Sequence, residues 1–153
     1  MAIALAAALG ITLSAPAARA ATVTVQAESY AAQSGVAVET TADTGGGQNA
    51  AYLADGDWMR FDQVDLGPAG RLTVSARIAA ATGSGSVELR TGSLTGPLLA
   101  VIQTGPTGGW QTWATRSADV TTHPTGAQTV FVGGGLGTPR PDVHSNKDCI
   151  RLR

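Results

Sequence analysis

Polar and apolar residues alternate without a break in Arg71-Leu72-Thr73-Val74-Ser75-Ala76-Arg77-Ile78. Because successive side chains of a β-strand point to opposite faces of a sheet, this alternation predicts a strand with one buried face and one face in water. The expected buried residues are Leu72, Val74, Ala76 and Ile78, and the expected solvent-facing residues are Arg71, Thr73, Ser75 and Arg77.

Shorter runs of the same kind recur along the chain, separated by turns rich in glycine and proline such as Gly67-Pro68-Ala69-Gly70. The other expected strands are Thr22–Glu28, Val36–Thr40, Ala50–Leu53, Trp58–Val64, Ser86–Arg90, Leu98–Gln103, Trp110–Ser117 and Gln128–Val132. No stretch after residue 20 keeps the apolar spacing of a helix. Many short strands joined by such turns predict an all-β fold, namely an antiparallel β-sandwich of the jelly-roll type.

The first twenty residues differ in composition from the rest. Ala, Leu and Ile dominate Ile3–Leu13, and Ala18-Arg19-Ala20 has the small-x-small pattern that signal peptidase cleaves. We therefore expect residues 1–20 to be a signal peptide and residues 21–153 to form one β-sandwich domain of a secreted, extracellular protein. The alternative is a buried N-terminal helix, which Pro16 would end. The apolar run is shorter than the ~20 residues that span a bilayer, so no membrane partner is expected.

Composition excludes several classes of function. The 153 residues carry 10 Lys and Arg against 11 Asp and Glu, a net charge of −1, and contain no basic run. A nucleic-acid partner is therefore not expected. One cysteine, Cys149, cannot close a disulfide within the chain, and with only 2 His it cannot supply an ordinary zinc site.

The sequence contains no recognisable set of catalytic residues. Two carboxylates could in principle act as the acid and nucleophile of a glycosidase. Asp55-Gly56-Asp57 is, however, better explained as a turn in which Asp side chains accept backbone N–H groups. No G-x-S-x-G motif occurs, and His123 and His144 fall in expected surface loops.

Two aromatic residues closely follow glycine-rich loops. Tyr52 comes shortly after Gly45-Gly46-Gly47, and Trp110 directly follows Gly109. Rings in such positions would lie at the rim of a sandwich, where they could stack on the C–H faces of sugars while amides and carboxylates pair with sugar hydroxyls. The alternative is that these rings pack in the core. Trp58 and Trp113 lie within expected strands and are assigned to the core.

Five segments in order resemble carbohydrate-binding module family 6. They are Val25-Gln26-Ala27-Glu28-Ser29-Tyr30, Val36-Ala37-Val38-Glu39-Thr40-Thr41, Thr44-Gly45-Gly46-Gly47-Gln48-Asn49-Ala50-Ala51-Tyr52-Leu53, Asp55-Gly56-Asp57-Trp58-Met59 and Gly108-Gly109-Trp110-Gln111-Thr112-Trp113. The resemblance runs from about Val23 to about Val132. It implies a jelly roll that binds polysaccharide without cleaving it, usually in association with a glycoside hydrolase.

The resemblance also implies a sugar site and a calcium site. Tyr52 and Trp110 match the two aromatic residues that sandwich a sugar ring, and Glu39 matches the acidic residue beside them. In the calcium site, Gln26 and Glu28 match the ligands near the N-terminal strand, and their i, i+2 spacing would put both side chains on one strand face.

The C-terminus departs from the family pattern. If Asn146-Lys147-Asp148-Cys149 takes the place of the family's last strand, Asn146 is the asparagine of the sugar site and Asp148 a further calcium ligand. Cys149 then replaces a core tryptophan. The last strand, within residues 146–153, is accordingly expected to be atypical.

Three hypotheses of function follow. The first is a secreted, non-catalytic module that binds a polysaccharide or oligosaccharide of the xylan or β-glucan type, with a glycoside hydrolase as a partner in the same system. The second is a small secreted glycoside hydrolase or lyase that uses Glu39 with a second carboxylate. The third is a structural or adhesive sandwich without a sugar site.

Overall fold

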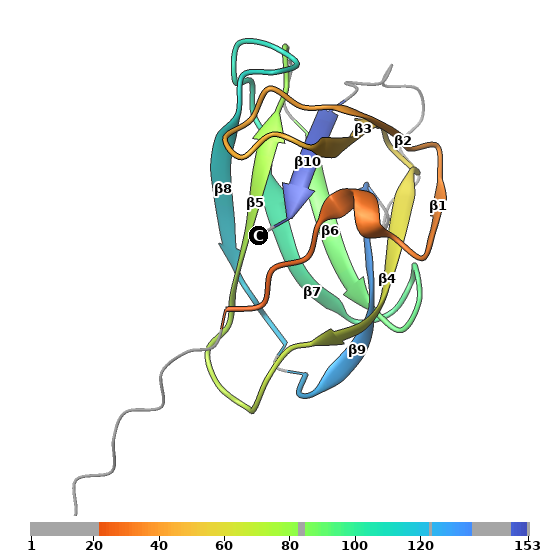
Figure 1. Ribbon diagram of the computed structural model, residues 1–153. Coiled ribbons are helices and arrows are strands. Elements are labelled where there is room, and N and C mark those ends of the chain that lie inside the picture. The colour runs from red at the N-terminus through yellow and green to blue at the C-terminus, as the bar shows by residue number, and fades with distance from the viewer. Residues whose placement is uncertain (1–21, 83–84, 123, 136–147, 153) are drawn as a thin grey trace, which may run out of the picture.

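The computed structural model describes residues 22–82, 85–122, 124–135 and 148–152, the last of these as a backbone path. Two sheets of five strands each make up this part of the chain (Figure 1). The first sheet has the order β1 (Ala32–Ser34), β4 (Trp58–Asp65), β9 (Ala127–Gly134), β6 (Ser86–Thr91) and β7 (Leu98–Gln103). The second has the order β2 (Ala37–Thr40), β3 (Gln48–Leu53), β10 (Asp148–Leu152), β5 (Thr73–Ala79) and β8 (Ala114–Asp119).

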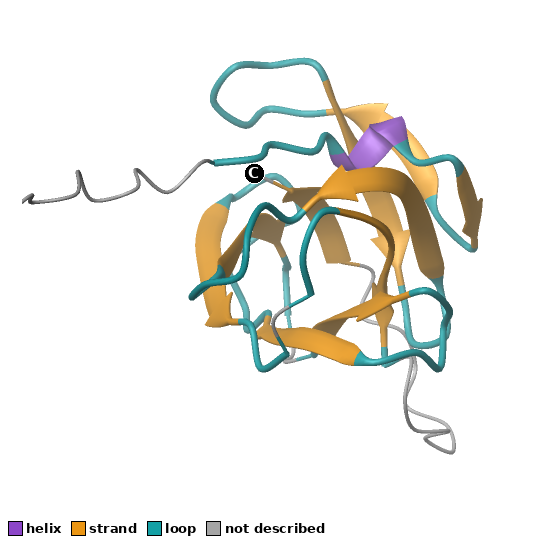
Figure 2. Ribbon diagram, turned by 90° about the horizontal axis from the view of Figure 1, so that it is seen from below, coloured by secondary structure: helices purple, strands orange, loops and turns teal. Residues whose placement is uncertain are grey.

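Every strand pair in both sheets is antiparallel, which confirms the predicted β-sandwich. In the described part of the chain, the 3-10 turn η1 (Ala27–Ser29) is the one helical element (Figure 2). No helix of the described residues is long and apolar enough to cross a membrane.

The core lies between the inner faces of the two sheets. In β5, Ala76 and Ile78 are buried as the alternation predicts, and they meet apolar residues from the opposite sheet. The largest fully buried apolar side chains are Met59, Ile78, Leu99, Ile102, Val87 and Val132. Each side chain of this size stabilises the fold by about 1.5–3 kcal/mol when it leaves water, so the two facing apolar surfaces hold the layers together.

Two of the expected strands are wrong: Thr22–Glu28 forms no strand, and Trp110–Ser117 begins later than expected. Residues 22–26 lie outside any strand, because the backbone N and the Oγ of Ser29 donate to the Gln26 carbonyl, at 3.0 and 2.6 Å, and close η1 there. Gln26 and Glu28 therefore do not share a strand face. The strand expected at Trp110–Ser117 begins only at Ala114, since a tight turn occupies the residues before it.

Two tryptophans assigned to the core are found on outer faces instead. Trp58 is half-buried on the outer side of the first sheet, where its ring lies 5.8 Å from that of Phe131. Trp113 is half-buried and packs on Ala51 and Ala79, on the outer side of the second sheet. Arg77 is also not fully in solvent, because its guanidinium turns to a buried carboxylate described below.

The last strand occupies the middle of the second sheet. Residues 149–152 of β10 pair in regular register with β5, and Cys149 is the Cα partner of Ala79. Against β3 the register of β10 shifts between Asp148 and Ile150. This shift marks the place where β3 carries one of the candidate site residues.

Candidate functional site

Tyr52 lies at a bulge in β3. Leu53 pairs with Asp148 and Ala50 with Ile150, so two residues of β3, Ala51 and Tyr52, stand opposite one residue of β10. Tyr52 has a φ of 65°, a left-handed conformation that is rare for a bulky residue. The alternation of the strand breaks at this point, and Tyr52 is 44% exposed between buried neighbours. The bulge thus turns the ring outward.

Trp110 lies at the tip of a turn in the loop that joins β7 to β8. The hydroxyl of Thr107 fixes this loop beside β5, accepting from the Ala80 N–H at 2.8 Å and donating to the Ala80 carbonyl at 3.0 Å. The Thr112 N–H then donates to the Gly109 carbonyl at 3.1 Å, which closes a turn with Trp110 and Gln111 at its centre. The Trp110 side chain is 43% exposed. Neither Tyr52 nor Trp110 therefore packs in the core.

Glu39 lies on β2 beside the loop of Trp110. Its Oε1 accepts from Gln111 Nε2 at 2.9 Å and from Asn49 Nδ2 at 3.5 Å. Asn49 is the Cα partner of Glu39 across β2 and β3. Three residues further along β3, at about 3.3 Å per residue, Tyr52 follows about 10 Å away. The structure thus links Glu39 directly to the turn of Trp110 and, through the β2–β3 pair, to the strand of Tyr52.

The glycine-rich turn connects β2 to β3. Gly45, Gly46 and Gly47 all have positive φ, at 95°, 61° and 88°, a run of left-handed residues that side-chain-bearing amino acids rarely adopt. The Thr41 N–H donates to the Gly47 carbonyl at 3.1 Å and closes the turn. Glycine is therefore favoured at all three positions, and it allows the chain to turn back and pair with the strand of Glu39.

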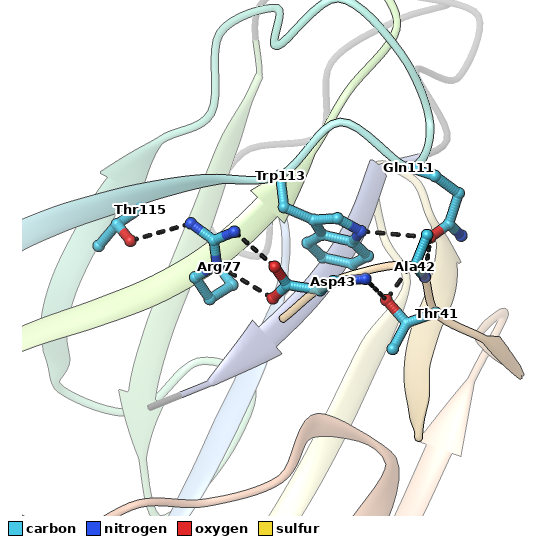
Figure 3. A network of polar contacts seen from close by, with 7 residues as sticks. All are labelled: Thr41, Ala42, Asp43, Arg77, Gln111, Trp113 and Thr115. Atoms are coloured by element: carbon cyan, nitrogen blue, oxygen red, sulfur yellow. Dashed lines mark hydrogen bonds and ion pairs between the residues drawn. The ribbon is translucent and has the colours of Figure 1, made fainter. Parts of the chain in front are cut away.

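A buried ion pair holds this turn against β5 (Figure 3). The Asp43 side chain is 1% exposed, and Arg77 donates to both of its oxygens, with Nε at 3.0 Å from Oδ2. The hydrogen bond to Asp43 raises the pKa of Arg77 above its ordinary value, which burial alone would lower. The ion pair therefore attaches the glycine-rich turn to β5.

The proposed calcium ligands are only partly supported by local geometry. Among the described residues, no three His, Cys, Asp or Glu side chains lie together as a metal site. Glu28 fits the role, since its Oε2 is buried and has no hydrogen-bond partner there. η1 packs against β3 and β10, the strand that begins at Asp148. The side chain of Gln26 is exposed and receives no such support.

Other residues singled out by the sequence differ in outcome. Asn146 lies outside the described residues, and for Asp148 only the backbone is described. Asp55-Gly56-Asp57 forms the expected turn, in which Asp57 Oδ2 accepts the Ala54 N–H at 2.9 Å. No role is assigned to Gln111 from the sequence, although it lies in the family motif, because its partners Glu39 and Ala42 are 72 and 69 residues away in the chain.

An antiparallel β-sandwich that exposes two aromatic side chains beside a glutamate has the arrangement of a carbohydrate-binding module. The sequence matches the family described as carbohydrate binding module (family 6) over residues 26–133. The chain belongs to that family.

Individual relatives agree with this membership. An arabinoxylan arabinofuranohydrolase of Paenibacillus polymyxa is 38% identical over 120 residues, which cover 74% of this chain and 18% of that protein. The chain thus spans less than a fifth of the length of this relative. Among solved structures, a β-1,3-glucan binding family 6 module from Bacillus halodurans has a TM-score of 0.71 at 37% identity, covering 84% of this chain and 91% of its own. A family 6 module from Clostridium cellulolyticum in complex with xylose has a TM-score of 0.72 at 29% identity, covering 86% and 96%.

Proposed function

We propose that the chain binds polysaccharide of the xylan or β-glucan type at a site formed by Tyr52, Trp110 and Glu39, and that it does so without cleaving the glycan. The observation that carries the proposal is the exposure of both rings on strained or turn backbone, beside a carboxylate that amides hold in place. Aromatic faces stack on sugar C–H groups, and a fixed carboxylate accepts hydroxyl protons. The names of the relatives, which mention arabinoxylan, β-1,3-glucan and xylose, support the choice of glycan class.

Binding at such a site is expected to be weak. A surface site covers one or two sugar units, while association costs several kcal/mol in lost freedom of motion. Dissociation constants on the order of 10 μM to 1 mM are therefore expected for short oligosaccharides.

Affinity electrophoresis tests the function without a prior choice of ligand. The chain and Trp110→Ala are run through native gels that contain xylan, laminarin, agarose or cellulose derivatives, with calcium present. We expect xylan or laminarin to retard the wild-type chain and Trp110→Ala to migrate as in a gel without polymer. If neither polymer retards a folded chain, the proposal is wrong. Release of reducing sugar that Glu39→Gln abolishes would instead support a glycoside hydrolase or lyase.

Calcium is proposed as a structural ion at Glu28. The buried, unpartnered Oε2 of Glu28 supports this, because a carboxylate oxygen kept from water needs a cation or a donor. Bound there, the ion would supply charge compensation for Glu28 and tie η1 to the sheet. Asp148 and Gln26 remain proposed further ligands.

Secretion and an enzyme partner complete the proposal. The composition of residues 1–20 supports export, with Ala21 as the first residue of the processed chain and residues 21–153 as the binding domain. N-terminal sequencing of the exported protein should begin at Ala21, and a chain that still begins at Met1 would contradict the assignment. The small share of the arabinofuranohydrolase that the chain matches supports action together with a glycoside hydrolase.

A further inference from the structure

The Gln111 side chain connects three separate parts of the site. Its Nε2 donates to Glu39 Oε1 on β2 at 2.9 Å. Its Oε1 accepts from the Ala42 N–H at 2.8 Å, from Trp113 Nε1 at 3.2 Å and from Thr41 Oγ1 at 3.5 Å. Figure 3 shows the amide beside the Trp113 ring and facing the chain at Thr41 and Ala42. The Gln111 side chain thus joins the Trp110 turn both to β2 and to the glycine-rich turn.

These contacts define the orientation of the Gln111 amide. Ala42 offers a backbone N–H and Trp113 an indole N–H, and both groups can only donate. Glu39 offers a carboxylate, which as an ion can only accept. If the amide were rotated by half a turn, its NH₂ would face two donors and its oxygen a carboxylate. The site therefore requires a group with a donor at one end and an acceptor at the other, which glutamine supplies.

The same contacts couple the charged and aromatic parts of the site. Trp110 precedes Gln111 in the Gly109–Thr112 turn, so holding the Gln111 side chain limits the positions that the turn can take. Glu39 accepts a second hydrogen bond from the side-chain amide of Asn49, a fully buried residue. The carboxylate and the ring are thus fixed relative to each other through one residue that need not contact the sugar.

We propose that Gln111 is a positioning residue that holds the Glu39 carboxylate and the Trp110 ring in the arrangement that binds sugar. The inference rests on the proposed function of that site. A module with loose loops would have to order them on binding, at a cost in affinity, whereas an arrangement held in advance avoids that cost.

The charged groups around Gln111 make the proposal testable by pH. Glu39 on β2 contacts the amide directly, whereas Asp43, on the turn beside Thr41, is neutralised by Arg77 of β5. In Gln111→Glu, a second carboxylate would face Glu39, and their repulsion would raise the pKa of the pair above that of a lone glutamate. One proton taken up between them would restore a hydrogen bond in place of the Nε2 donor.

The experiment is a calorimetric titration of xylohexaose and laminarihexaose into wild type, Gln111→Ala and Gln111→Glu from pH 8 to pH 5. Thermal unfolding of each variant is measured under the same conditions. We expect Gln111→Ala to bind at least tenfold more weakly than wild type at every pH. For Gln111→Glu, the ratio of its dissociation constant to that of wild type should be tenfold or more at pH 8 and should fall severalfold toward pH 5. Gln103→Glu, the same charge change at an exposed position of β7, should give a ratio near one throughout.

The outcomes separate this proposal from the function on which it rests. If wild type binds and both Gln111 variants bind equally well, Gln111 has no positioning role. A ratio for Gln111→Glu that does not change with pH, with affinity lost only in proportion to unfolding, would also overturn the proposal and leave a purely structural role. If wild type itself binds neither oligosaccharide, the proposed function fails first.

Discussion

At the scale of the residue, Tyr52 of the candidate site has a backbone conformation that costs local stability. A non-glycine residue in the left-handed region costs about 1–3 kcal/mol, and the pairing of β3 with β10 on either side holds Tyr52 there. In a regular strand, successive side chains of β3 would point alternately to the core and to the outer face. The bulge replaces that pattern and leaves the ring exposed.

The strain at Tyr52 predicts an unusual order of stability for two variants. Glycine adopts positive φ without steric cost, whereas alanine does not, so Tyr52→Gly should be more stable than Tyr52→Ala by about 1 kcal/mol. Both variants should lose sugar binding. Chemical denaturation measures the difference, with Val38 of β2, an exposed residue without positive φ, as the control.

At Val38 the order should be reversed, with the glycine variant about 0.5–1 kcal/mol less stable than the alanine variant. If Tyr52→Gly is also less stable than Tyr52→Ala, the backbone at Tyr52 is not strained.

Glu28 carries the prediction for calcium. Calcium at about 100 times its dissociation constant should raise the free energy of unfolding by about 2.7 kcal/mol, and Glu28→Gln should remove this effect. Thermal unfolding with calcium and with a chelator provides the measurement. Asp119→Asn is the matched control, because its amide oxygen can still accept from Thr73 Oγ1. An unfolding midpoint of wild type that is the same in calcium and in chelator would contradict the proposal.

At the scale of the element, the sequence identifies strands well where one face meets the core and poorly elsewhere. Leu98–Gln103 was predicted with the observed bounds, because its apolar residues have buried partners. Ala32–Ser34 was missed, since a three-residue edge strand offers no apolar alternation. Thr22–Glu28 alternates but forms no strand, because alternation alone does not provide a partner to pair with.

The residues of the candidate site could be predicted from the sequence, but the contacts that position them could not. Tyr52, Trp110 and Glu39 could be named from a family motif, while the bulge and the hydrogen bonds that position them depend on segments far apart in the chain. Gln111 and Glu39 are 72 residues apart, and Arg77 and Asp43 are 34 apart. Contacts of this kind leave no periodic trace in the sequence.

The turn between β2 and β3 should depend on its buried ion pair. Asp43→Asn leaves Arg77 without its charged partner and should destabilise the fold by about 1–3 kcal/mol. Asp62→Asn removes the exposed partner of Arg60, whose pair is 38% and 43% exposed, and should change stability by ~0–1 kcal/mol. Denaturant unfolding compares the two.

The pH dependence of this pair follows from Arg77. A pKa raised by folding gives a stabilisation that is complete below the ordinary arginine value and is lost only as the pH rises through the raised value. The difference between wild type and Asp43→Asn should therefore stay constant between about pH 6 and 9. Equal effects of Asp43→Asn and Asp62→Asn would contradict a special role for the buried pair.

At the scale of the whole molecule, two strands of the second sheet and one loop carry the residues of the candidate site. β3 presents Tyr52, the loop between β7 and β8 presents Trp110, and β2 presents Glu39 from the edge of the second sheet. β10 is the middle strand of that sheet and pairs with both β3 and β5, so it joins the strand of Tyr52 to β5. The position of Tyr52 therefore depends on the pairing of β3 with β10.

The most direct test of the sugar site is a calorimetric titration of xylohexaose and laminarihexaose into wild type and Trp110→Ala. Val23→Ala, which truncates another exposed apolar side chain, is the matched control. We predict saturable binding of at least one oligosaccharide by wild type and by Val23→Ala, and no measurable binding by Trp110→Ala at an unchanged unfolding midpoint. Binding by Trp110→Ala with the affinity of wild type would contradict the site described here.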